Sequence, residues 1–182
     1  MTCILGYSNG KEVHIVGDSG GFSNCDKVIR ADEKVFRLGD DFIVGFAGSF
    51  RLGQIIRYDF DPPLRPSGIS DINYLISHFV DALRQVLKDK GYSVISDSQE
   101  SMDDGLFLLG YRGKLYTIYP DFQVSISIDG IDAVGYAAQY AMIAFDCLSN
   151  IKSIKRRLAT SLEVVEKRCT ALCQQFIYEV LK

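Results

Sequence analysis

The chain begins Met1-Thr2-Cys3-Ile4-Leu5-Gly6-Tyr7-Ser8-Asn9-Gly10-Lys11-Glu12-Val13-His14-Ile15-Val16-Gly17-Asp18, a stretch that predicts a β-hairpin. Both arms carry strand-forming residues, and Asn9-Gly10 is a dipeptide that accepts the positive φ angles of a type I′ turn. A hairpin returns its second arm to the start of the first. We therefore expect Thr2 to lie alongside Asp18.

Thr2 follows the initiator methionine and has the small side chain after which methionine is usually removed. Its terminal α-amine would then have an ordinary pKa of about 8, so part of it is unprotonated near neutral pH. A hydroxyl nucleophile can be activated by the N-terminal amine of its own residue. The alternative is that Thr2 is only the second residue of an edge strand.

Composition describes a globular protein with a substantial core. The chain has 182 residues, 47% of them apolar, so we expect a single domain over residues 1–182. The net charge of −3 and the lack of a basic stripe argue against nucleic acid as a partner. No apolar run approaches the ~18 residues of a membrane span. Without a basic segment followed by an apolar one at the start, we expect no signal peptide and a cytoplasmic protein.

The cysteines do not have the paired spacing of a zinc site, and the two histidines lie in unrelated segments. We therefore expect no metal, no cofactor, and reduced thiols at Cys3, Cys25, Cys147, Cys169 and Cys173. The last two are four residues apart in a helical pattern, which predicts one shared helix face. Cys3 stays open as a thiol nucleophile, although strand alternation turns it away from the side of Thr2.

The remaining pattern predicts strands, two helices, more strands, two helices and a last strand. Strands are expected at 28–30, 34–38, 42–48, 106–111, 114–119, 123–128, 131–134 and 176–181. Helices are expected at 50–58, 72–88, 137–148 and 162–173. Loops are expected at 19–24 and 96–104; the first is glycine-rich, but no Gly-Lys-Ser/Thr follows, which disfavours a phosphate-binding loop. This grouping indicates the α+β class, as a four-layer αββα sandwich of two antiparallel sheets.

Three polar residues stand at strand ends with equal spacing. Thr2, Asp18 and Lys34 are separated by 16 residues each. Gly48 ends a further strand where a helix begins, so its backbone N–H can point at an oxyanion. The alternative is that Asp18 and Lys34 form a surface ion pair worth about 0–1 kcal/mol.

These pieces resemble the proteasome β-type N-terminal-nucleophile (Ntn) hydrolases, the group of the proteasome β subunits and the bacterial peptidase HslV. The resemblance is tight over residues 2–58 and looser beyond, and it is greatest to bacterial and phage members of the superfamily. It is carried by Thr2-Cys3-Ile4, Gly17-Asp18, Lys34-Val35-Phe36-Arg37-Leu38 and Gly45-Phe46-Ala47-Gly48.

The resemblance implies a threonine peptidase. Thr2 would attack a peptide carbonyl while the α-amine takes the proton, and Lys34, kept charged by Asp18, would lower the pKa of the hydroxyl. The Gly48 N–H would stabilise the oxyanion, a contribution of ~3 kcal/mol in comparable sites. The implied partners are a peptide or protein substrate and further copies of the chain in a ring or stacked rings, while a partner ATPase is left open.

The chain departs from the family pattern at one turn. Tyr136 stands where the family carries a serine that orders the catalytic water and amine. The later aspartate and serine of the family are not evident, and Cys169 and Thr170 fall in that region. A catalytically inactive scaffold or binding subunit of the same fold is therefore the alternative function.

Overall fold

The structure, a computed structural model, describes residues 2–23, 26–96, 99–170 and 172–182. Cys25 and Met1, on which two of the sequence predictions fall, lie outside these ranges. The strands are β1 (Cys3–Ser8), β2 (Val13–Gly17), β3 (Gly20–Ser23), β4 (Asp26–Ile29), β5 (Val35–Leu38), β6 (Phe42–Ala47), β7 (Val94–Ser96), β8 (Gln99–Ser101), β9 (Leu106–Tyr111), β10 (Lys114–Ile118), β11 (Val124–Ile126), β12 (Ile131–Gly135) and β13 (Ile177–Leu181).

The helices fall into two groups along the chain. The first group is α1 (Phe50–Tyr58) and a continuous helical segment made of α2 (Asp71–Tyr74), the π-helical segment η1 (Leu75–Phe79) and α3 (Val80–Asp89). The second group is α4 (Ala138–Cys147) and α5 (Ile154–Glu166). Within the described ranges, every helix is too short or too polar to cross a lipid bilayer.

Nine of the described strands form two antiparallel sheets. One has the order β12-β1-β2-β13 and the other β11-β10-β9-β6-β5, while β3 pairs with β4 and β7 with β8. The expected hairpin is present, with Leu5 opposite Val16. The Asn9 side chain accepts hydrogen bonds from two N–H groups in the turn, and Gly10 has φ +85°. The predicted α+β class with antiparallel sheets is confirmed.

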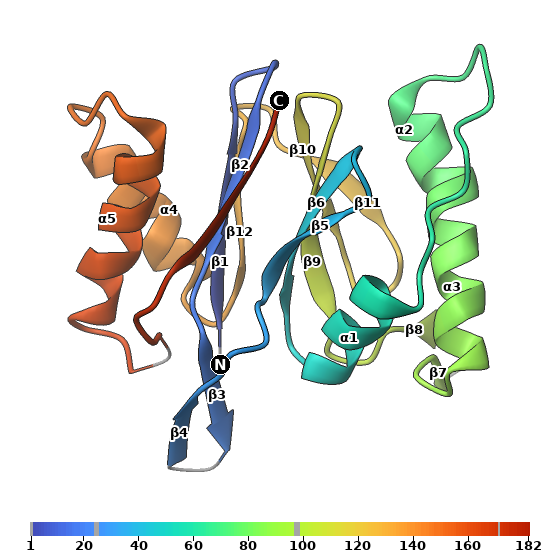
Figure 1. The fold of residues 1–182 in the computed structure, drawn as a ribbon, viewed down its shortest axis with the longest axis horizontal. Helices are drawn as coiled ribbons and strands as arrows, with labels where there is room; N and C mark the ends of the chain where they lie inside the picture. Colours follow the sequence, from blue (N-terminus) through green and yellow to red (C-terminus); the bar gives the residue numbers. More distant parts are fainter. Residues whose placement is uncertain (1, 24–25, 97–98, 171) are drawn as a thin grey trace.

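The helix groups lie on opposite sides of the two sheets, as Figure 1 shows. Three buried apolar clusters fill the spaces between them. Leu52 and Phe79 belong to the cluster between α1–α3 and the five-stranded sheet. Ile4 and Ile43 belong to the cluster between the sheets, and Leu158 to the cluster between the four-stranded sheet and α4–α5. Buried apolar side chains thus cover both faces of each of these two sheets.

Two segments that were expected to be loops contain strands. Gly20 and Gly21 of β3 pair through their backbones with β4, a contact that needs no strand-forming side chains. Strand β8 lies within the predicted loop at 96–104 and pairs with β7, and Glu100 ties it to α3 by accepting a hydrogen bond from Arg84 at 2.7 Å. In both cases pairing with a neighbouring strand overrides a local sequence that is poor in strand-forming residues, glycine-rich in β3 and polar in β8.

The prediction of a helix at 162–173 is wrong in its position. Helix α5 begins at Ile154, after Ser153 accepts a hydrogen bond from the Arg156 N–H, and it ends at Glu166. Ser153 supplies the side-chain cap that starts the helix early. Cys169 and Cys173 therefore lie beyond the helix and do not share a helix face.

Candidate active site

Thr2, Asp18 and Lys34 meet at one end of the two sheets. Lys34 Nζ donates hydrogen bonds to Thr2 Oγ1 at 2.9 Å and to both carboxylate oxygens of Asp18 at 3.1 and 3.0 Å. All three residues are buried. The Asp18–Lys34 contact is therefore not the surface ion pair that the sequence left open, because both side chains are at most 1% exposed.

The backbone fixes the Asp18 carboxylate from two sides. Its Oδ1 accepts from the Cys3 N–H at 3.0 Å, and its Oδ2 accepts from the Gly20 N–H at 2.8 Å. The Asp18 N–H in turn donates to the Cys3 carbonyl at 3.3 Å, which continues the pairing of β2 with β1. The carboxylate is thus held in place before it meets Lys34.

Lys34 immediately precedes β5. Its carbonyl accepts from the Phe46 N–H at 3.0 Å, and its Nζ also donates to the Gly20 carbonyl at 2.5 Å. Burial lowers the pKa of Lys34 from its ordinary value, and the nearby Asp18 carboxylate opposes this by favouring the charged form. The ammonium is a compact cation with four oxygen acceptors, one of which is the Thr2 hydroxyl.

Cys3 is a poor candidate nucleophile. It is fully buried and packs in the cluster that faces α4 and α5. Burial, and next the Asp18 carboxylate, raise the pKa of the Cys3 thiol well above its ordinary value. The thiol therefore remains protonated and lies on the other side of the strand from the Lys34 contact.

Gly48 is connected to Thr2 only through intervening residues. A Cβ placed on Gly135 would lie 2.3 Å from the Thr2 carbonyl oxygen and 3.4 Å from Ala47 Cβ. Gly48 follows Ala47 at the end of β6 and has φ +98°, with its Cβ position 2.7 Å from the Asp104 carbonyl oxygen. Only glycine fits this backbone without strain. The role of Gly48 as an oxyanion donor stays a prediction.

Two neighbours of the site were missed from the sequence. The Gly20 carbonyl binds Lys34, and the pattern Asp18-Ser19-Gly20 carried a signal for it, because an aspartate often accepts from the N–H two residues later. Cys173 is fully buried, with Sγ 2.7 Å from the Cβ position of Gly20. No local pattern could place Cys173, because a distant segment brings it to the site.

The Tyr136 side chain does not join the buried group formed by Thr2, Asp18 and Lys34. Its side chain is 70% exposed. Together with Tyr140 and Thr170 it lines a surface cleft of about 640 Å³ between α4 and the end of α5. Cys169 lies in the same cleft. The turn after Gly135 therefore directs its tyrosine outward, onto the helical surface.

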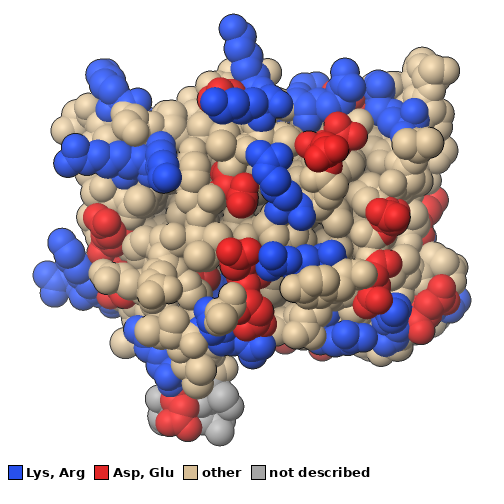
Figure 2. Space-filling view, viewed as in Figure 1, with Lys and Arg blue, Asp and Glu red and all other residues tan. Residues whose placement is uncertain are grey.

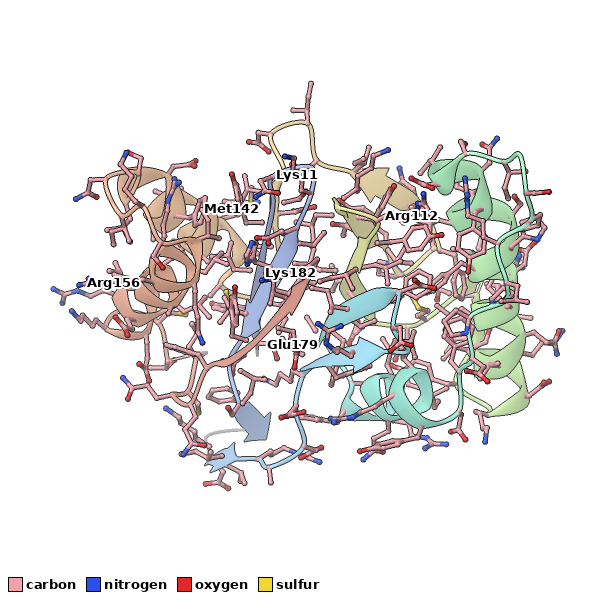
Figure 3. All side chains as sticks on the ribbon, turned by 45° about the horizontal axis from the view of Figure 1, so that its top comes forward. Lys11, Arg112, Met142, Arg156, Glu179 and Lys182 are labelled. Atoms are coloured by element: carbon pink, nitrogen blue, oxygen red, sulfur yellow. The ribbon has the colours of Figure 1, made fainter. Side chains whose placement is uncertain are left out.

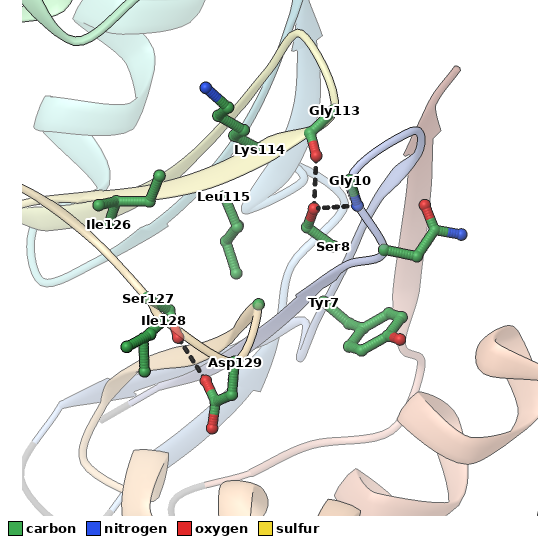
Figure 4. Close-up of a pocket in the computed structure, with 12 residues that line it drawn as sticks. Tyr7, Ser8, Gly10, Gly113, Lys114, Leu115, Ile126, Ser127, Ile128 and Asp129 are labelled. Atoms are coloured by element: carbon green, nitrogen blue, oxygen red, sulfur yellow. Dashed lines mark hydrogen bonds between the residues drawn. The ribbon is translucent and has the colours of Figure 1, made fainter.

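A second hollow lies at the opposite end of the sheets from Thr2, and its polar groups are hydrogen-bonded to one another (Figure 4). It has a volume of about 430 Å³ and is bordered by the β1–β2 and β9–β10 turns. Its polar groups bond to one another: Ser8 Oγ donates to the Gly113 carbonyl and accepts from the Gly10 N–H, and Ser127 donates to Asp129. These groups are already used in holding the turns together.

The charged side chains around the body are mixed. Figure 2 shows Lys and Arg interspersed with Asp and Glu, so this face has no extended field of one sign. Among the described residues, no group of three or more His, Cys, Asp or Glu side chains lies close enough to hold a metal ion. The described cysteines are all free thiols.

The comparisons with known proteins rest on structure alone. No protein-family model and no curated protein sequence matches the chain. Among solved structures, BPH from Thiobacillus denitrificans matches with TM-score 0.76 and 17% identity over 100% of this chain and 98% of that one. Eukaryotic HslV from Trypanosoma brucei matches with TM-score 0.69 and 17% identity, covering 100% and 99% of the two chains. The chain has the HslV-like Ntn hydrolase fold.

Two further structures with this HslV-like fold extend the comparison. Thiobacillus denitrificans BPH in complex with epoxomicin matches with TM-score 0.77 and 16% identity, over 100% of this chain and 98% of the other. Anbu from Yersinia bercovieri matches with TM-score 0.65 and 13% identity, over 98% and 81%. The resemblance read from residues 2–58 thus extends to the backbone of the whole chain.

Proposed function

We propose that the chain is an N-terminal threonine amidohydrolase, a peptidase of the proteasome β type that acts through a Thr2 acyl-enzyme after removal of Met1. The observation that carries the proposal is the 2.9 Å hydrogen bond from Lys34 Nζ to Thr2 Oγ1 inside a buried cluster. A buried cation beside a hydroxyl favours its deprotonated form. A scaffold alone has no need of that arrangement, which costs desolvation of both charges.

In the proposed reaction, Thr2 Oγ attacks the substrate carbonyl carbon and its proton passes to the Thr2 α-amine, directly or through a water. The Gly48 N–H stabilises the negative oxygen of the tetrahedral intermediate, which then expels the substrate amine with that proton. An ester on Thr2 remains. Water attacks the ester in the second half, releases the carboxylic acid and restores the hydroxyl.

Asp18 and Lys34 act as one unit in this proposal. Asp18 offsets part of the burial cost of the Lys34 charge, and its own position is set by the Cys3 and Gly20 N–H groups. The cation then faces both the hydroxyl and the developing charge. Without Asp18, Lys34 would tend to lose its proton in this buried setting.

The wider setting of the site is part of the proposal. We infer one αββα four-layer domain in the cytoplasm that assembles with further copies into a ring or stacked rings, with a peptide or protein as substrate. The HslV-like fold supports this assignment. The inference makes no use of a cofactor.

An inactive scaffold is the second candidate, and one observation favours it. Tyr136 occupies the turn where the resemblance expects a serine, and its side chain is directed to the surface cleft rather than into the buried cluster. A site without that serine would orient its amine and water less well.

The test combines intact mass with a covalent probe. Purified protein should lack the mass of Met1, and a peptide epoxyketone should add once, at Thr2, since a hydroxyl and a neighbouring amine can attack its two electrophilic carbons together. Thr2→Ala should abolish the adduct and lower peptide hydrolysis by roughly 10⁴-fold or more. Cys3→Ala is the matched control and should retain the adduct. Folded, Met-free protein that takes no probe and cleaves no peptide would leave only the scaffold.

A further inference from the structure

The cleft between α4 and the end of α5 is lined mainly by exposed apolar and aromatic side chains. Tyr136, Tyr140 and Ile143 are 60–70% exposed there, and Val164 is 43% exposed. Figure 1 shows both helices on the outer side of the four-stranded sheet. Single exposed apolar residues are ordinary on a protein surface, whereas a group of them in one hollow marks an interaction surface.

Helix α4 is apolar on two faces. Its inner face packs Ala141 and Phe145 against the four-stranded sheet. Its outer face carries Tyr140, Ile143 and Cys147, which recur at intervals of three and four residues and continue the line that Tyr136 begins. We call these four residues the α4 stripe. A helix that is apolar all round is typical of one buried on every side, so the stripe is suited to being covered.

Charges of opposite sign stand at the two ends of the α4 stripe. Because the connection 148–153 is short, α4 and α5 run antiparallel, and Arg168 after the end of α5 lines the cleft together with Tyr136. Asp146 is exposed near the other end of α4, three residues after Ile143. Neither charge forms an ion pair with another residue that the structure describes.

A second copy of the chain complements both features at once. In a two-fold contact the two copies use the same surface, and a residue on the axis meets its own counterpart. With the axis at Ile143, in the middle of the stripe, the two stripes cover each other in opposite directions. Arg168 of each copy then lies over the end that carries the other copy's Asp146. A lipid surface would cover the stripe but leave Asp146 without a cation.

We propose that two copies of the chain associate through the α4 stripe, with Ile143 at the two-fold axis and Arg168 of each copy paired with Asp146 of the other. The inference rests on the assembly with further copies that the proposed function includes, and it adds the contact surface. It does not depend on the chemistry of Thr2. The contact begins one residue after Gly135, whose Cβ position is 2.3 Å from the Thr2 carbonyl oxygen, so the partner covers the turn beside the candidate site.

The first experiment tests the axis by disulfide cross-linking. Ile143→Cys in a Cys147→Ser background, treated with oxidised glutathione, should give a covalent dimer on non-reducing electrophoresis. The two introduced side chains meet across the axis, and a disulfide needs Cβ atoms about 4 Å apart. Ile128→Cys in the same background is the matched control, because Ile128 is fully exposed but lies outside the cleft. The control and the Cys147→Ser parent should stay uncross-linked.

The second experiment measures the mass of the assembly by light scattering as a function of concentration. Tyr140→Glu would bury a carboxylate among apolar side chains and should weaken association by about 30-fold or more. The mass should then fall by half, whether the contact joins two chains or two rings. Tyr58→Glu, at a residue 72% exposed on α1, is the matched control and should keep the wild-type mass.

The ion pair is tested by exchanging its charges. Arg168→Glu places two carboxylates opposite each other and should weaken association, and adding Asp146→Arg should restore it. Restoration is a result that misfolding of the single variant does not produce. If the double variant associates no better than Arg168→Glu, the pairing of these two residues is wrong.

The remaining outcomes separate this inference from the proposed function. A folded Tyr140→Glu protein with the wild-type mass, or a wild-type chain that is monomeric at every concentration, overturns the contact. The peptide epoxyketone is added to the same samples. Protein that cross-links through Ile143→Cys but takes no probe at Thr2 contradicts the proposed reaction and leaves the contact standing. Monomeric protein that takes the probe contradicts only the contact.

Discussion

The two ends of the paired sheets place lysine and aspartate in opposite environments. At one end, Lys34 and Asp18 form an ion pair whose side chains are 1% and 0% exposed. At the other end, Asp71 meets three cations, Arg65, Arg112 and Lys114, at 3.3–3.8 Å. The last two are more than half exposed. Figure 3 shows Arg112 at this end, near Lys11 of the β1–β2 turn.

The difference separates an ion pair that stabilises little from one that costs free energy to form. Exposed pairs such as that of Lys114 contribute about 0–1 kcal/mol and weaken with salt. A buried pair repays its desolvation only through close geometry and further hydrogen bonds, which Asp18 and Lys34 have in full. We infer that the buried pair serves to position the Lys34 ammonium and not to stabilise the fold.

The largest loss of stability is expected from removing one partner of the buried pair. Lys34→Met leaves the Asp18 charge buried without its cation and should lower the free energy of unfolding by about 3–5 kcal/mol. Lys114→Met, the exposed counterpart, should change it by less than about 1 kcal/mol. Urea unfolding of both variants gives the comparison.

The double variant Asp18→Asn, Lys34→Met is the control. It removes both charges and should recover a large part of the loss, although it cannot support the proposed reaction. Equal losses in Lys34→Met and Lys114→Met would contradict the burial of the pair.

Alanine substitutions at two glycines with positive φ, one at each end of the sheets, should differ less in their cost in stability. Gly10 has φ +85° and open space around its Cβ position, whereas Gly135 has φ +101° and the Thr2 carbonyl oxygen at 2.3 Å. Gly10→Ala should cost about 1–2 kcal/mol from backbone strain alone. Gly135→Ala adds overpacking of about 1–3 kcal/mol and should also slow modification of Thr2.

Thermal unfolding and probe-labelling rates measured on the same two variants test this prediction. A Gly135→Ala protein that labels at the wild-type rate would show that Thr2 does not depend on close packing of the turn after β12.

The smallest effect concerns His14, a second buried cation-forming group that has no carboxylate as close as that of Lys34. Its Nδ1 lies 2.5 Å from the Tyr178 hydroxyl and its Nε2 3.3 Å from Glu12. Burial lowers the pKa of His14 below its ordinary 6.5, with Glu12 opposing. Below pH 6.5 the unfolded chain therefore binds more protons than the folded one, and stability should fall as the pH decreases.

Urea unfolding at pH 7.5 and 5.5 should show this loss, and His14→Gln should reduce it. His78→Gln is the matched control, because His78 lies exposed on the π-helical segment, and it should leave the pH dependence unchanged. A loss of equal size in His14→Gln would assign the pH dependence to other groups.

Local sequence was sufficient for the part of the site that the first hairpin brings together. Thr2 and Asp18 border the paired strands β1 and β2, so their proximity follows from the hairpin. Lys34 leads into β5 of the other sheet, and its proximity depends on how the two sheets face each other. Gly20 could have been found from its distance to Asp18. Cys173 could not, because its position depends on how the segment after α5 returns to the sheet.

The errors in the predicted secondary structure also arise where local sequence is a weak guide. Helix α5 begins with a basic stretch whose apolar face is weak, so Ser153 was the better indicator of its start. The strands β3 and β8 owe their pairing to neighbours rather than to strand-forming residues.

The hydrogen bond between Thr2 and Lys34 joins the two sheets, because Thr2 leads into β1 of one and Lys34 into β5 of the other. A chain in which only one sheet has formed has no ammonium beside the hydroxyl. If Thr2 is the proposed nucleophile, its reactivity would then arise only in the native state, and other proteins would be protected from it during synthesis. The extent of probe labelling would accordingly measure the fraction of molecules whose two sheets have docked.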